Sequence, residues 1–375
     1  MSQKNLSKKL EKEILEFIED GNLKKYTPSL QIEVYLGGQK KISLKMGPKY
    51  RYYDLASLTK IIFTVPAMMQ ACDLGLLNIN HPVKKYLPWW PHSSTKIKNV
   101  LSHSASLPWW APYYKKLKNT PPAIRRESLL KILKKTPLVK SQKAVYSDVD
   151  FILLGFLLEA VYKKPLLEIW QNLNWRKRAS SLHFNPSNKP KYKRSLYAPT
   201  ERCPWRKRVL RGEVHDDNTW SFGGVSSHAG LFGQIEDVSR YGLLLRQGFI
   251  KKTKSHNHMV NSKKQFGQNE LATPKTIRKF VRRAIPSQRG DWALGYMLPS
   301  QTGSSSGKYL SRKSVGHTGF TGTSLWYDPH KDILITILSH RVHPTRKNRR
   351  FVALRPILHD MIIELLFKKI KSDSV

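Results

Sequence analysis

The sequence predicts a mixed α/β fold of the α+β type, in which an antiparallel sheet flanked by helices is split by an inserted, mainly helical lobe. Strand patterns occur near both ends of the chain, each accompanied by a helix, while the central part is mostly helical. This segregation indicates one layered unit whose two halves are brought together by folding. We expect residues 1–85 and 285–375 to form the discontinuous α/β lobe, and residues 86–284 to form the helical lobe.

The first predicted elements are a helix and a hairpin. Apolar side chains recur at helical spacing before residue 20, and they predict an amphipathic helix whose inner face carries Leu10, Ile14, Leu15 and Ile18. Two segments of alternating apolar and polar residues then flank Gly37-Gly38, which is the pattern of a β-hairpin. A second helix is expected from about Ser57 to Leu77.

The remaining elements follow in two groups. Helical patterns occur at ESLLKILKK, VDFILLGFLLEAVYKKPLLEIWQNL, DVSRYGLLLRQGF and PKTIRKFVRRA. Between them, residues 176–234 are expected to be irregular. Strand patterns return towards the C-terminal end, at DWALGYML, KSVGHTGFTGTSLWYDP and ILITILSHRV, and a last helix is expected at LRPILHDMIIELLFKKI.

The composition argues against a disordered chain and gives a strongly basic one. Apolar residues make up 40% of the 375 residues, and ten tryptophans add bulk for a core. The formal net charge of +40 favours weak contact with anionic surfaces, although the basic residues are scattered in short clusters. The sequence has no zinc-finger spacing, RNP-type strand or basic zipper, so specific nucleic-acid binding is not expected.

Cysteine content and hydropathy favour a cytoplasmic protein without a transmembrane segment. Only Cys72 and Cys203 are present, and their spacing suggests no disulfide framework. The N-terminal segment lacks a signal-peptide pattern, and the longest apolar run is too short to span a bilayer and carries Glu159. Export without a classical signal stays open.

A serine and a lysine one helical turn apart begin the second predicted helix. Ser57 and Lys60 lie on the same helical face, where the amine could activate the hydroxyl as a nucleophile. The helix N-terminus would favour negative charge on the serine oxygen. The spacing alone is not diagnostic, because it recurs at Ser93/Lys96, Ser128/Lys131 and Ser305/Lys308.

Two later motifs complete a candidate active site. Tyr146 lies in a polar loop before an apolar helix, where it is a natural partner for the lysine. Its Tyr-x-Asp spacing, ending at Asp148, occurs elsewhere only at Tyr52/Asp54. The stretch SVGHTGFTG holds the sequence's one His-Thr-Gly, and a glycine-bearing edge strand lets a substrate carbonyl approach a backbone N–H.

Ser-x-x-Lys, Tyr-x-Asp and His-Thr-Gly in this order resemble the motifs of the active-site serine penicillin-recognising enzymes. From about Thr27 onward the chain resembles the class C β-lactamase family and its esterase and D-aminopeptidase relatives. The stretches that carry this resemblance include LASLTKIIFTVPAMMQACDLGLLNINHPVKKYLP, VLSHSASLP, VHDDNTWSFGGVSSHAGLFGQIEDVSRYG and GHTGFTGTSLWYDPHKDILITILSHRVHP. The resemblance implies a β-lactamase/transpeptidase-like fold and two-step acyl transfer, with neither a cofactor nor a metal.

The family's roles, carried over by position, give each motif residue a function. The resemblance implies that Ser57 is acylated, that Lys60 activates it, and that Tyr146 is the general base and protonates the leaving group. The backbone N–H groups of Ser57 and Phe320 would form the oxyanion hole. The strand that aligns the substrate would contain His317, Thr318 and Gly319.

Three departures from the family pattern bear on function. Asp148 stands where Asn is common, and an ionised carboxylate near Lys60 would favour the charged amine and shift the basic role to the tyrosine. His317 replaces the lysine of β-lactamases, so avid carboxylate recognition is not expected. Ala105 and Ser106 replace the usual Ser/Thr-Gly pair, and we expect this to alter the turn there.

Aromatic and histidine clusters near these motifs have two interpretations. Trp109 and Trp110 are candidates for the wall of an acyl or leaving-group pocket, and the alternative is that these Pro- and Trp-rich loops pack on the helical lobe. Two groups could suggest a metal, namely His215 with Asp216-Asp217, and His256 with His258. Neither has the ligand set of a zinc site, so structural roles and no metal are expected.

The leading functional hypothesis is a serine hydrolase of esterase or D-amino-acid peptidase type, acting on a small ester, amide or peptide. The alternative within enzymes is a true β-lactamase or DD-carboxypeptidase, for which Arg341 would supply the missing positive charge. A non-catalytic binding protein with a basic surface is the alternative of another class. The intact set of Ser57, Lys60 and Tyr146 argues against that alternative, because a scaffold does not need all three.

Overall fold

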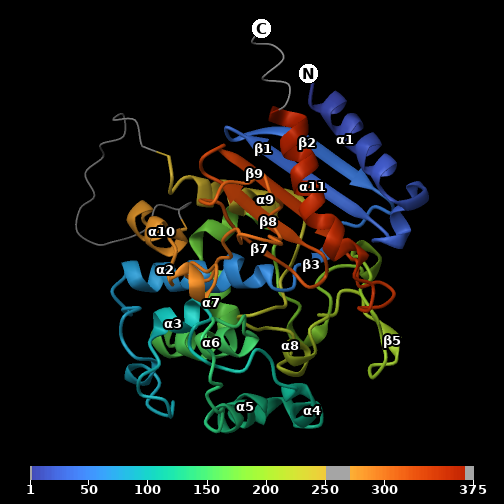
Figure 1. Cartoon of the computed structure of the whole chain (residues 1–375). Coiled ribbons are helices and arrows are strands. Elements are labelled where there is room, and N and C mark those ends of the chain that lie inside the picture. Colours follow the sequence, from blue (N-terminus) through green and yellow to red (C-terminus); the bar gives the residue numbers. More distant parts are fainter. Residues whose placement is uncertain (1, 251–270, 368–375) are drawn as a thin grey trace.

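The centre of the fold is a five-stranded antiparallel sheet to which both ends of the chain contribute (Figure 1). The structure is a computed structural model that describes residues 2–250 and 271–367. The strand order is β2-β1-β9-β8-β7, so the N-terminal hairpin pairs with the last strand of the chain. The strands of this sheet are β1 (Leu30–Leu36), β2 (Gln39–Met46), β7 (Val315–Thr318), β8 (Ser324–Asp328) and β9 (Ile333–Ser339). This confirms the predicted fold class.

The predicted hairpin is present, with Gly37 and Gly38 at its turn. Both glycines have a positive φ, of 62° and 81°, which residues with a Cβ rarely adopt. β1 pairs with β2 on one side and with β9 on the other. It is therefore an interior strand, and its first five residues are buried.

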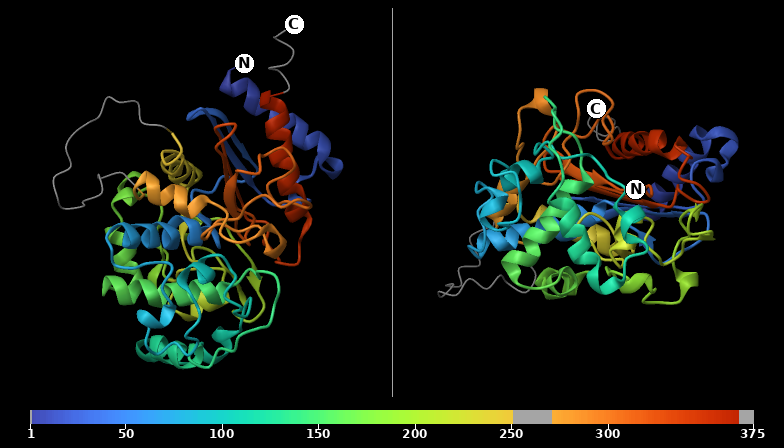
Figure 2. Two further views of the ribbon diagram at one scale, coloured as in Figure 1. Left: turned by 60° about the vertical axis from the view of Figure 1, so that its left-hand side comes forward. Right: turned by 90° about the horizontal axis from the view of Figure 1, so that it is seen from below.

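Two helices from opposite ends of the chain cover one face of the sheet (Figures 1 and 2). α1 (Gln3–Phe17) and α11 (Arg350–Phe367) contact each other and share a core cluster with strand residues such as Trp326. The prediction that Leu15 belongs to the buried face of α1 was wrong, because this side chain is 38% exposed. Leu15 follows the buried Ile14 by one residue, about 100° around the helix, and so turns away from the sheet.

The opposite face of the sheet packs on α9 (Ile235–Arg246), which contacts β1, β8 and β9. Gly242 allows this close approach, since a Cβ there would lie only 2.5 Å from a methyl carbon of Leu334. Helices of the central part of the chain lie below the sheet and α9 in Figure 1. The sheet is thus buried between two layers of helices, as an α+β layer architecture requires.

The helix that carries the candidate nucleophile begins with an unusual turn. Lys60–Thr64 is π-helical and continues into α2 (Val65–Asp73), with Pro66 in the first turn of α2. Proline has no N–H to donate to the carbonyl four residues earlier, and its ring crowds that carbonyl, which favours the wider turn before it. The helix ends at Asp73 rather than near Leu77, because the chain turns at Gly75, with a φ of 74°.

Short helices surround the long, buried helix α6 (Asp148–Tyr162), which begins with Ser147 as its N-cap. The long helical run expected here is broken at Lys163, which has a left-handed φ of 52°, and resumes after Pro165 as α7 (Leu166–Asn172). Further helices are α3 (Ile97–Leu101), α4 (Tyr113–Leu117), α5 (Arg125–Leu133), α8 (Asp217–Ser221) and α10 (Pro274–Val281).

Two predictions of local structure differ from the structure. The segment DWALGYML forms isolated bridges rather than a strand, because the chain reverses at Gly295, which has a φ of 88°. The region 176–234, expected to be irregular, contains three short strands. β4 (Arg202–Cys203) pairs with β5 (Arg208–Val209) within the region, and β6 (Phe232–Gly233) pairs with β3 (Tyr53–Asp54), which lies near the start of the chain.

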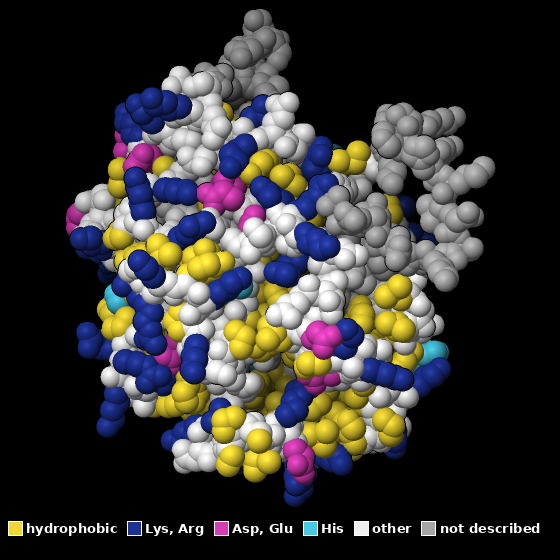
Figure 3. Space-filling view, turned by 180° about the vertical axis from the view of Figure 1, so that it is seen from behind, with side chains coloured by type: hydrophobic (Ala, Val, Ile, Leu, Met, Phe, Trp, Pro, Cys, Tyr) yellow, Lys and Arg dark blue, Asp and Glu magenta, His cyan; other side chains and the backbone are white. Residues whose placement is uncertain are grey.

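Basic side chains are distributed over the surface rather than gathered in one stripe. Figure 3 shows Lys and Arg side chains scattered over much of one face, with fewer acidic side chains among them. Cys72 and Cys203 are free thiols. Within residues 2–250 and 271–367, no helix is long and apolar enough to cross a membrane. The division into two lobes near residues 85 and 285 stays a prediction.

Candidate active site

The predicted serine, lysine and tyrosine meet at the start of the π-helical segment. The hydroxyl of Tyr146 donates a hydrogen bond to Ser57 Oγ at 2.8 Å, and Lys60 Nζ donates to the same oxygen at 3.0 Å. Tyr146 and Ser57 are 89 residues apart in the chain, so the fold brings them together. The arrangement has the geometry of a nucleophile between two groups that can carry its proton.

All three N–H bonds of the Lys60 ammonium have acceptors. Besides the serine oxygen, these are Asp148 Oδ1 at 2.7 Å and the carbonyl oxygen of His228 at 3.1 Å. Burial lowers the pKa of Lys60, but the Asp148 carboxylate and Tyr146 raise it, and the net pKa is raised. Lys60 is therefore a charged ammonium near neutral pH. This agrees with the expectation that Asp148 favours the charged amine.

Tyr146 is held as a neutral phenol beside this ammonium. Lys60 Nζ lies 5.0 Å from the centre of the Tyr146 ring, and the ring of His317 lies 5.8 Å from it. Burial raises the pKa of Tyr146 to about 12, although Lys60 acts in the opposite direction. One proton must therefore leave the Lys60–Tyr146 pair before the tyrosine can accept the serine proton.

A buried aspartate shapes the turn that leads into the nucleophile. Asp54 accepts hydrogen bonds from the backbone N–H of Ala56 at 2.8 Å and of His215 at 2.7 Å. Ala56, directly before Ser57, has a left-handed φ of 46°, which costs about 1–2 kcal/mol in a residue other than glycine. The carboxylate of Asp54 holds this conformation, so the Tyr-x-Asp at Tyr52/Asp54 also serves the site.

Two hydrogen bonds join the turn between β7 and β8 to the turn before Ser57. The hydroxyl of Thr321 donates to the Asp54 carbonyl oxygen at 2.7 Å, and that of Thr323 donates to the Leu55 carbonyl oxygen at 3.1 Å. Gly319 lies against this second bond, where a Cβ would be 2.1 Å from Thr323 Oγ1 and 2.7 Å from the Leu55 oxygen. A glycine is required at this position, and the predicted His-Thr-Gly strand thus lies against the nucleophile turn.

The two backbone N–H groups expected to form the oxyanion hole are not used elsewhere in the fold. Within the part of the chain that the structure describes, neither the N–H of Ser57 nor that of Phe320 has a hydrogen-bond acceptor. The Phe320 side chain is 49% exposed, so this turn faces solvent. Both groups are therefore free to bind a substrate oxygen.

The histidine of the His-Thr-Gly strand is neutral and buried. Its Nδ1–H donates to the Thr318 carbonyl oxygen at 2.7 Å, and burial, followed by Lys60, lowers the pKa of His317 to about 3. His317 therefore supplies no positive charge at neutral pH. The Thr318 hydroxyl lies 3.9 Å from the sulfur of Met297.

Asp148, Asp216 and His228 form a cluster that was not foreseen. Each offers one potential metal-ligand atom, and these atoms all lie within 4.8 Å of one another. Each is also engaged within the protein, because Asp148 pairs with Lys60, and Asp216 pairs with His228 at 2.9 Å while capping α8. The contacts within the protein account for this cluster without a metal.

The other groups weighed as metal ligands have structural partners or lie elsewhere. His215 lies 3.4 Å from Glu201, and Asp217 pairs with Arg206 at 2.6 Å. His256 and His258 lie outside the described residues. These contacts of His215 and Asp217 are consistent with the structural role expected for them.

The tryptophans of the Pro-rich loops divide into buried and exposed ones. Trp90 is fully buried in the core, whereas Trp109 is 64% exposed and Trp110 is half-buried. The Trp109 carbonyl accepts the backbone N–H of Asp148 at 2.9 Å, which fixes Trp109 next to the second motif. Its place beside the site is thus compatible with the predicted pocket wall, which stays a prediction.

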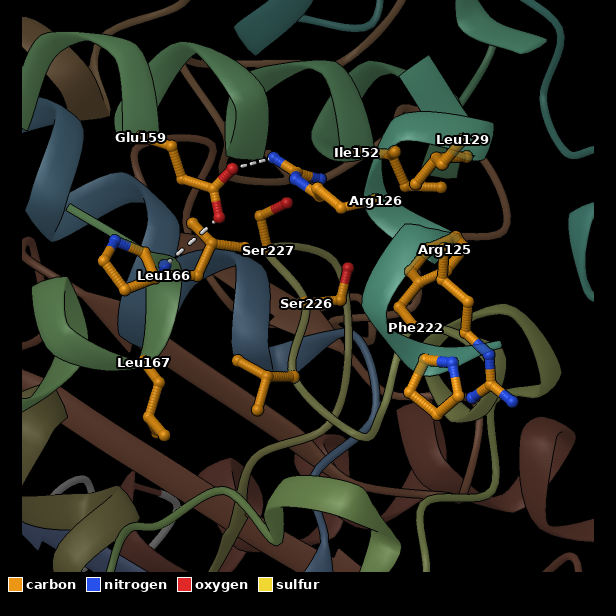
Figure 4. Close-up of a pocket in the computed structure, with 13 residues that line it drawn as sticks. Arg125, Arg126, Leu129, Ile152, Glu159, Leu166, Leu167, Phe222, Ser226 and Ser227 are labelled. Carbon is orange, nitrogen blue, oxygen red and sulfur yellow. Dashed lines mark hydrogen bonds and ion pairs between the residues drawn. The ribbon is translucent and has the colours of Figure 1, made fainter. Parts of the chain in front are cut away.

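A cavity of about 200 Å³ lies outside this constellation (Figure 4). Its lining combines apolar side chains from α5 to α7 with the ion pair of Arg126 and Glu159, as well as Ser226 and Ser227. None of the catalytic candidates lines it. The cavity is therefore not the place where a substrate would meet Ser57.

Several residues that build the site were not predicted as part of it. Asp54, Thr321, Thr323 and His228 all act through contacts with residues far away in the chain. The stretch VHDDNTWSFGGVSSHAGLFG, which carries part of the resemblance, also contains His228. That stretch was the available signal for His228, but its contact with Lys60 is visible only in the fold.

Comparison with known proteins agrees with the site. Residues 27–356 match the Beta-lactamase family. A protein of Salmonella typhimurium named "Putative D-alanyl-D-alanine carboxypeptidase" is 30% identical over 324 residues, which cover 78% of this chain and 69% of that protein. The family match extends from before the first motif to beyond the last.

Solved structures with lower identity share the fold. EstCE1, described as a hydrolase with promiscuous acyltransferase activity, has a TM-score of 0.64 at 15% identity, covering 94% of this chain and 98% of its own. The octameric penicillin-binding protein homologue from Pyrococcus abyssi has a TM-score of 0.63 at 16% identity, covering 98% and 81%. The chain belongs to the beta-lactamase family and is a serine hydrolase.

Proposed function

We propose that this hydrolase acts on small esters or amides through a covalent acyl-enzyme on Ser57. The observation that carries the proposal is the convergence of Tyr146 OH and Lys60 Nζ on one oxygen, Ser57 Oγ, at 2.8 and 3.0 Å. A serine hydroxyl is a weak nucleophile unless a neighbouring group takes its proton. Tyr146 is in hydrogen-bonding range for that transfer, and the Lys60 ammonium contacts the same oxygen.

The proposed reaction has two acyl-transfer steps. After one proton has left the Lys60–Tyr146 pair, the phenolate of Tyr146 accepts the proton of Ser57 while Oγ bonds to the substrate carbonyl carbon. The phenol then protonates the departing alcohol or amine, and the bond to this leaving group breaks. The phenolate of Tyr146 then deprotonates a water molecule that attacks the acyl carbon on Ser57. The bond between this carbon and Oγ breaks, Tyr146 returns the proton to Oγ at 2.8 Å, and the acid is released. Lys60, as an ammonium, favours the phenolate by its charge.

Two backbone N–H groups are proposed to stabilise the negative oxygen that develops in each step. The proposal for Ser57 and Phe320 is supported by their lack of other acceptors within the described residues. It is also supported by the hydrogen bonds of Thr321 and Thr323, which tie the two turns to each other. Preorganised donors of this kind are commonly the largest contribution to acyl transfer.

The substrate preference is proposed to be that of an esterase or a D-amino-acid peptidase-like enzyme. His317 is neutral, so the strand lacks the fixed charge that would hold a substrate carboxylate. The Trp109 side chain is proposed as a pocket wall because it is exposed beside the second motif. No specific nucleic-acid partner is proposed, and the basic surface would make only weak contact with anionic surfaces.

A DD-carboxypeptidase or β-lactamase is the second candidate. The relative's printed name favours it, and so does the position of Arg341, whose guanidinium lies 4.8 Å from the centre of the Phe320 ring. Burial, together with Arg349, lowers the pKa of Arg341 to about 10, which leaves it charged at neutral pH. It could therefore supply the cation that His317 does not.

Mass spectrometry after reaction with a fluorophosphonate tests the proposed nucleophile. We expect one adduct, on Ser57, in the wild type and none in Ser57→Ala. Ser93→Ala, which changes an exposed Ser-x-x-Lys serine, should label like the wild type. A wild-type chain without an adduct, or with one on another serine, would contradict the proposal.

Kinetics with three substrate types separate the two candidates. We expect hydrolysis of p-nitrophenyl esters, with little turnover of nitrocefin or of a D-alanyl-D-alanine peptide. Efficient turnover of the peptide, together with its loss in Arg341→Gln but unchanged ester hydrolysis, would favour the carboxypeptidase instead.

A further inference from the structure

His103 holds the residues on both sides of Tyr146. The backbone N–H of Val145 donates to the His103 carbonyl oxygen at 3.0 Å, and the N–H of Ser147 donates to His103 Nδ1 at 3.1 Å. His103 is 1% exposed and has a left-handed φ of 54°. One residue, through its side chain and its own carbonyl, therefore fixes the backbone before and after the tyrosine.

The ring of His103 also contacts the ring of Tyr146. Their centres are 4.8 Å apart, and Trp292 lies 4.5 Å from His103 and 5.8 Å from Tyr146. The planes of Tyr146 and Trp292 differ by only 19°. The three rings pack against one another, and these contacts restrict the rotamer of Tyr146 that places its hydroxyl at Ser57 Oγ.

Asp150, in the first turn of α6, approaches the same nitrogen of His103. Its Oδ2 lies 3.1 Å from Nδ1, and the Asp150 side chain is as deeply buried as that of His103. Nδ1 accepts the N–H of Ser147, so it has a lone pair there and carries no proton. For the 3.1 Å contact with Asp150 to be a hydrogen bond as well, the carboxyl group must carry the proton and share the single Nδ1 lone pair with the N–H of Ser147.

The surroundings of the pair favour that proton position. Burial raises the pKa of the Asp150 carboxyl well above its usual value, and the nearby Asp148 acts in the same direction. Burial also lowers the pKa of His103 well below its usual value, as does Lys60. The titratable groups that face the pair from the neighbouring elements are Lys60, Tyr146, Asp148 and His317.

We propose that His103 and Asp150 are positioning residues for Tyr146, and that Asp150 is a neutral acid whose O–H donates to Nδ1 of His103. This inference rests on the proposed function, in which Tyr146 carries the proton of Ser57. The neutral pair orients the tyrosine without adding negative charge beside the Lys60 ammonium. A carboxylate at Asp150 would hold that ammonium more strongly and oppose the proton loss that acylation needs.

The substitution Asp150→Asn distinguishes the two possible states of Asp150, a neutral acid that donates a hydrogen bond and a charged carboxylate. The amide has nearly the shape of the acid, and its N–H can donate to Nδ1 in the same way. We expect kcat/KM for p-nitrophenyl acetate in Asp150→Asn to stay within about 3-fold of the wild type, with an unmoved pH profile. Asp150→Ala should lower kcat about 10- to 100-fold with little change in KM, because a misplaced tyrosine affects the transition state more than binding.

His103 offers an independent pair of variants. Asn keeps an acceptor oxygen near the position of Nδ1 and tolerates a left-handed φ, so His103→Asn should retain more activity than His103→Ala. His359→Asn, which changes another buried histidine on α11, should leave kcat unchanged. Circular dichroism and melting temperatures establish that each compared variant is folded.

Two results would overturn the inference. A pH profile of Asp150→Asn moved to lower pH by about one unit or more would show that the wild-type residue is a carboxylate acting on Lys60. Wild-type kcat in folded Asp150→Ala and His103→Ala would show that the pair does not position Tyr146.

Labelling with a fluorophosphonate keeps this inference distinct from the proposed function. If the wild type gives no adduct on Ser57, the proposed function itself fails. If the wild type is labelled on Ser57 and Asp150→Ala is labelled at the same rate, only the positioning role fails. Labelling on Ser57 that is slowed in Asp150→Ala and restored in Asp150→Asn supports both.

Discussion

The hydroxyl of Thr321 donates a hydrogen bond of 2.7 Å to the carbonyl oxygen of Asp54. Two residues later, Thr323 makes the equivalent bond to Leu55. These bonds join the turn that leads into Ser57 to the turn that carries Phe320. Two threonine side chains from the last part of the chain, bonded to backbone carbonyls of its first part, thus hold the two backbone N–H groups proposed as the oxyanion hole in relative position.

Thr321→Val is expected to lower kcat about 10-fold, with a smaller effect on KM, because the oxyanion donors lose their relative position. The variant also leaves the buried Asp54 carbonyl oxygen without its donor, which should destabilise the fold by about 1–3 kcal/mol. Steady-state kinetics with p-nitrophenyl acetate and urea unfolding measure the two effects.

Thr336→Val is the matched control for this change. Thr336 is also buried in a strand of the sheet, but its hydroxyl has no hydrogen-bond partner among the described residues. We expect this control to retain both kcat and stability. A Thr321→Val variant that behaves like Thr336→Val would contradict the role given to Thr321.

Activity is expected to rise with pH from neutral into the alkaline range. One proton must leave the Lys60–Tyr146 pair before acylation, and the pKa of each group is raised, to about 12 for Tyr146. The protonated, inactive form therefore dominates near neutral pH, and each pH unit should raise kcat/KM up to about 10-fold. The measurement is kcat/KM against pH, with spontaneous ester hydrolysis subtracted. A flat profile would contradict this protonation state.

Asp148→Asn should move that rising limb to lower pH by about 1 to 3 units. The carboxylate of Asp148 lies 2.7 Å from Lys60 Nζ and helps to raise the lysine's pKa, so its removal lets the proton leave more easily. Asp291→Asn, which breaks a surface pair with Arg283, should leave the profile unchanged. Equal profiles in the two variants would count against the control of Lys60 by Asp148.

Ser106→Gly is expected to stabilise the protein by about 0.5–1 kcal/mol. Ser106 has a left-handed φ of 59°, so the turn keeps a conformation suited to glycine although the residue has a Cβ. Whether Ala105 and Ser106 alter this turn relative to the family stays a prediction, and the left-handed φ of Ser106 implies backbone strain. Thermal unfolding measures the gain, and Ser94→Gly, at a turn residue without a positive φ, should show none.

Trp109→Ala should change the ratio of kcat/KM for p-nitrophenyl butyrate over acetate by about 10-fold. The exposed indole beside the second motif would contact the acyl or leaving group, and its removal would take away apolar contacts with the longer chain. Phe17→Ala removes an exposed aromatic on α1 and should leave the ratio unchanged. A ratio that is the same in both variants would argue that Trp109 is outside the pocket.

Local patterns predicted much of this protein. The hairpin at Gly37-Gly38 and the buried face of α1 around Ile14 follow from periodicity and glycine conformation. The order of three short motifs distinguished Ser57 from three other serines with the same spacing to a lysine. These features depend on neighbours within a few residues, or on a resemblance carried by contiguous stretches.

The tertiary structure decided the contacts between segments that are distant in the chain. By sequence, Asp54 belongs to one of two equivalent Tyr-x-Asp matches. Only the fold shows that its carboxylate accepts hydrogen bonds from the backbone N–H groups of Ala56 and His215. The apolar pattern of DWALGYML predicted a strand, whereas in the fold the backbone reverses direction at Gly295 and forms only isolated bridges.

The protonation of the site is likewise a property of the fold. The pKa of a lysine, a tyrosine or an aspartate depends on burial and on charges a few ångströms away, and neither is written in the local sequence. Ser57, Lys60 and Tyr146 could be named from the sequence alone. That Lys60 is a charged ammonium between Asp148 and His228, and that Asp150 faces His103 behind the tyrosine, depends on packing that only the folded chain creates.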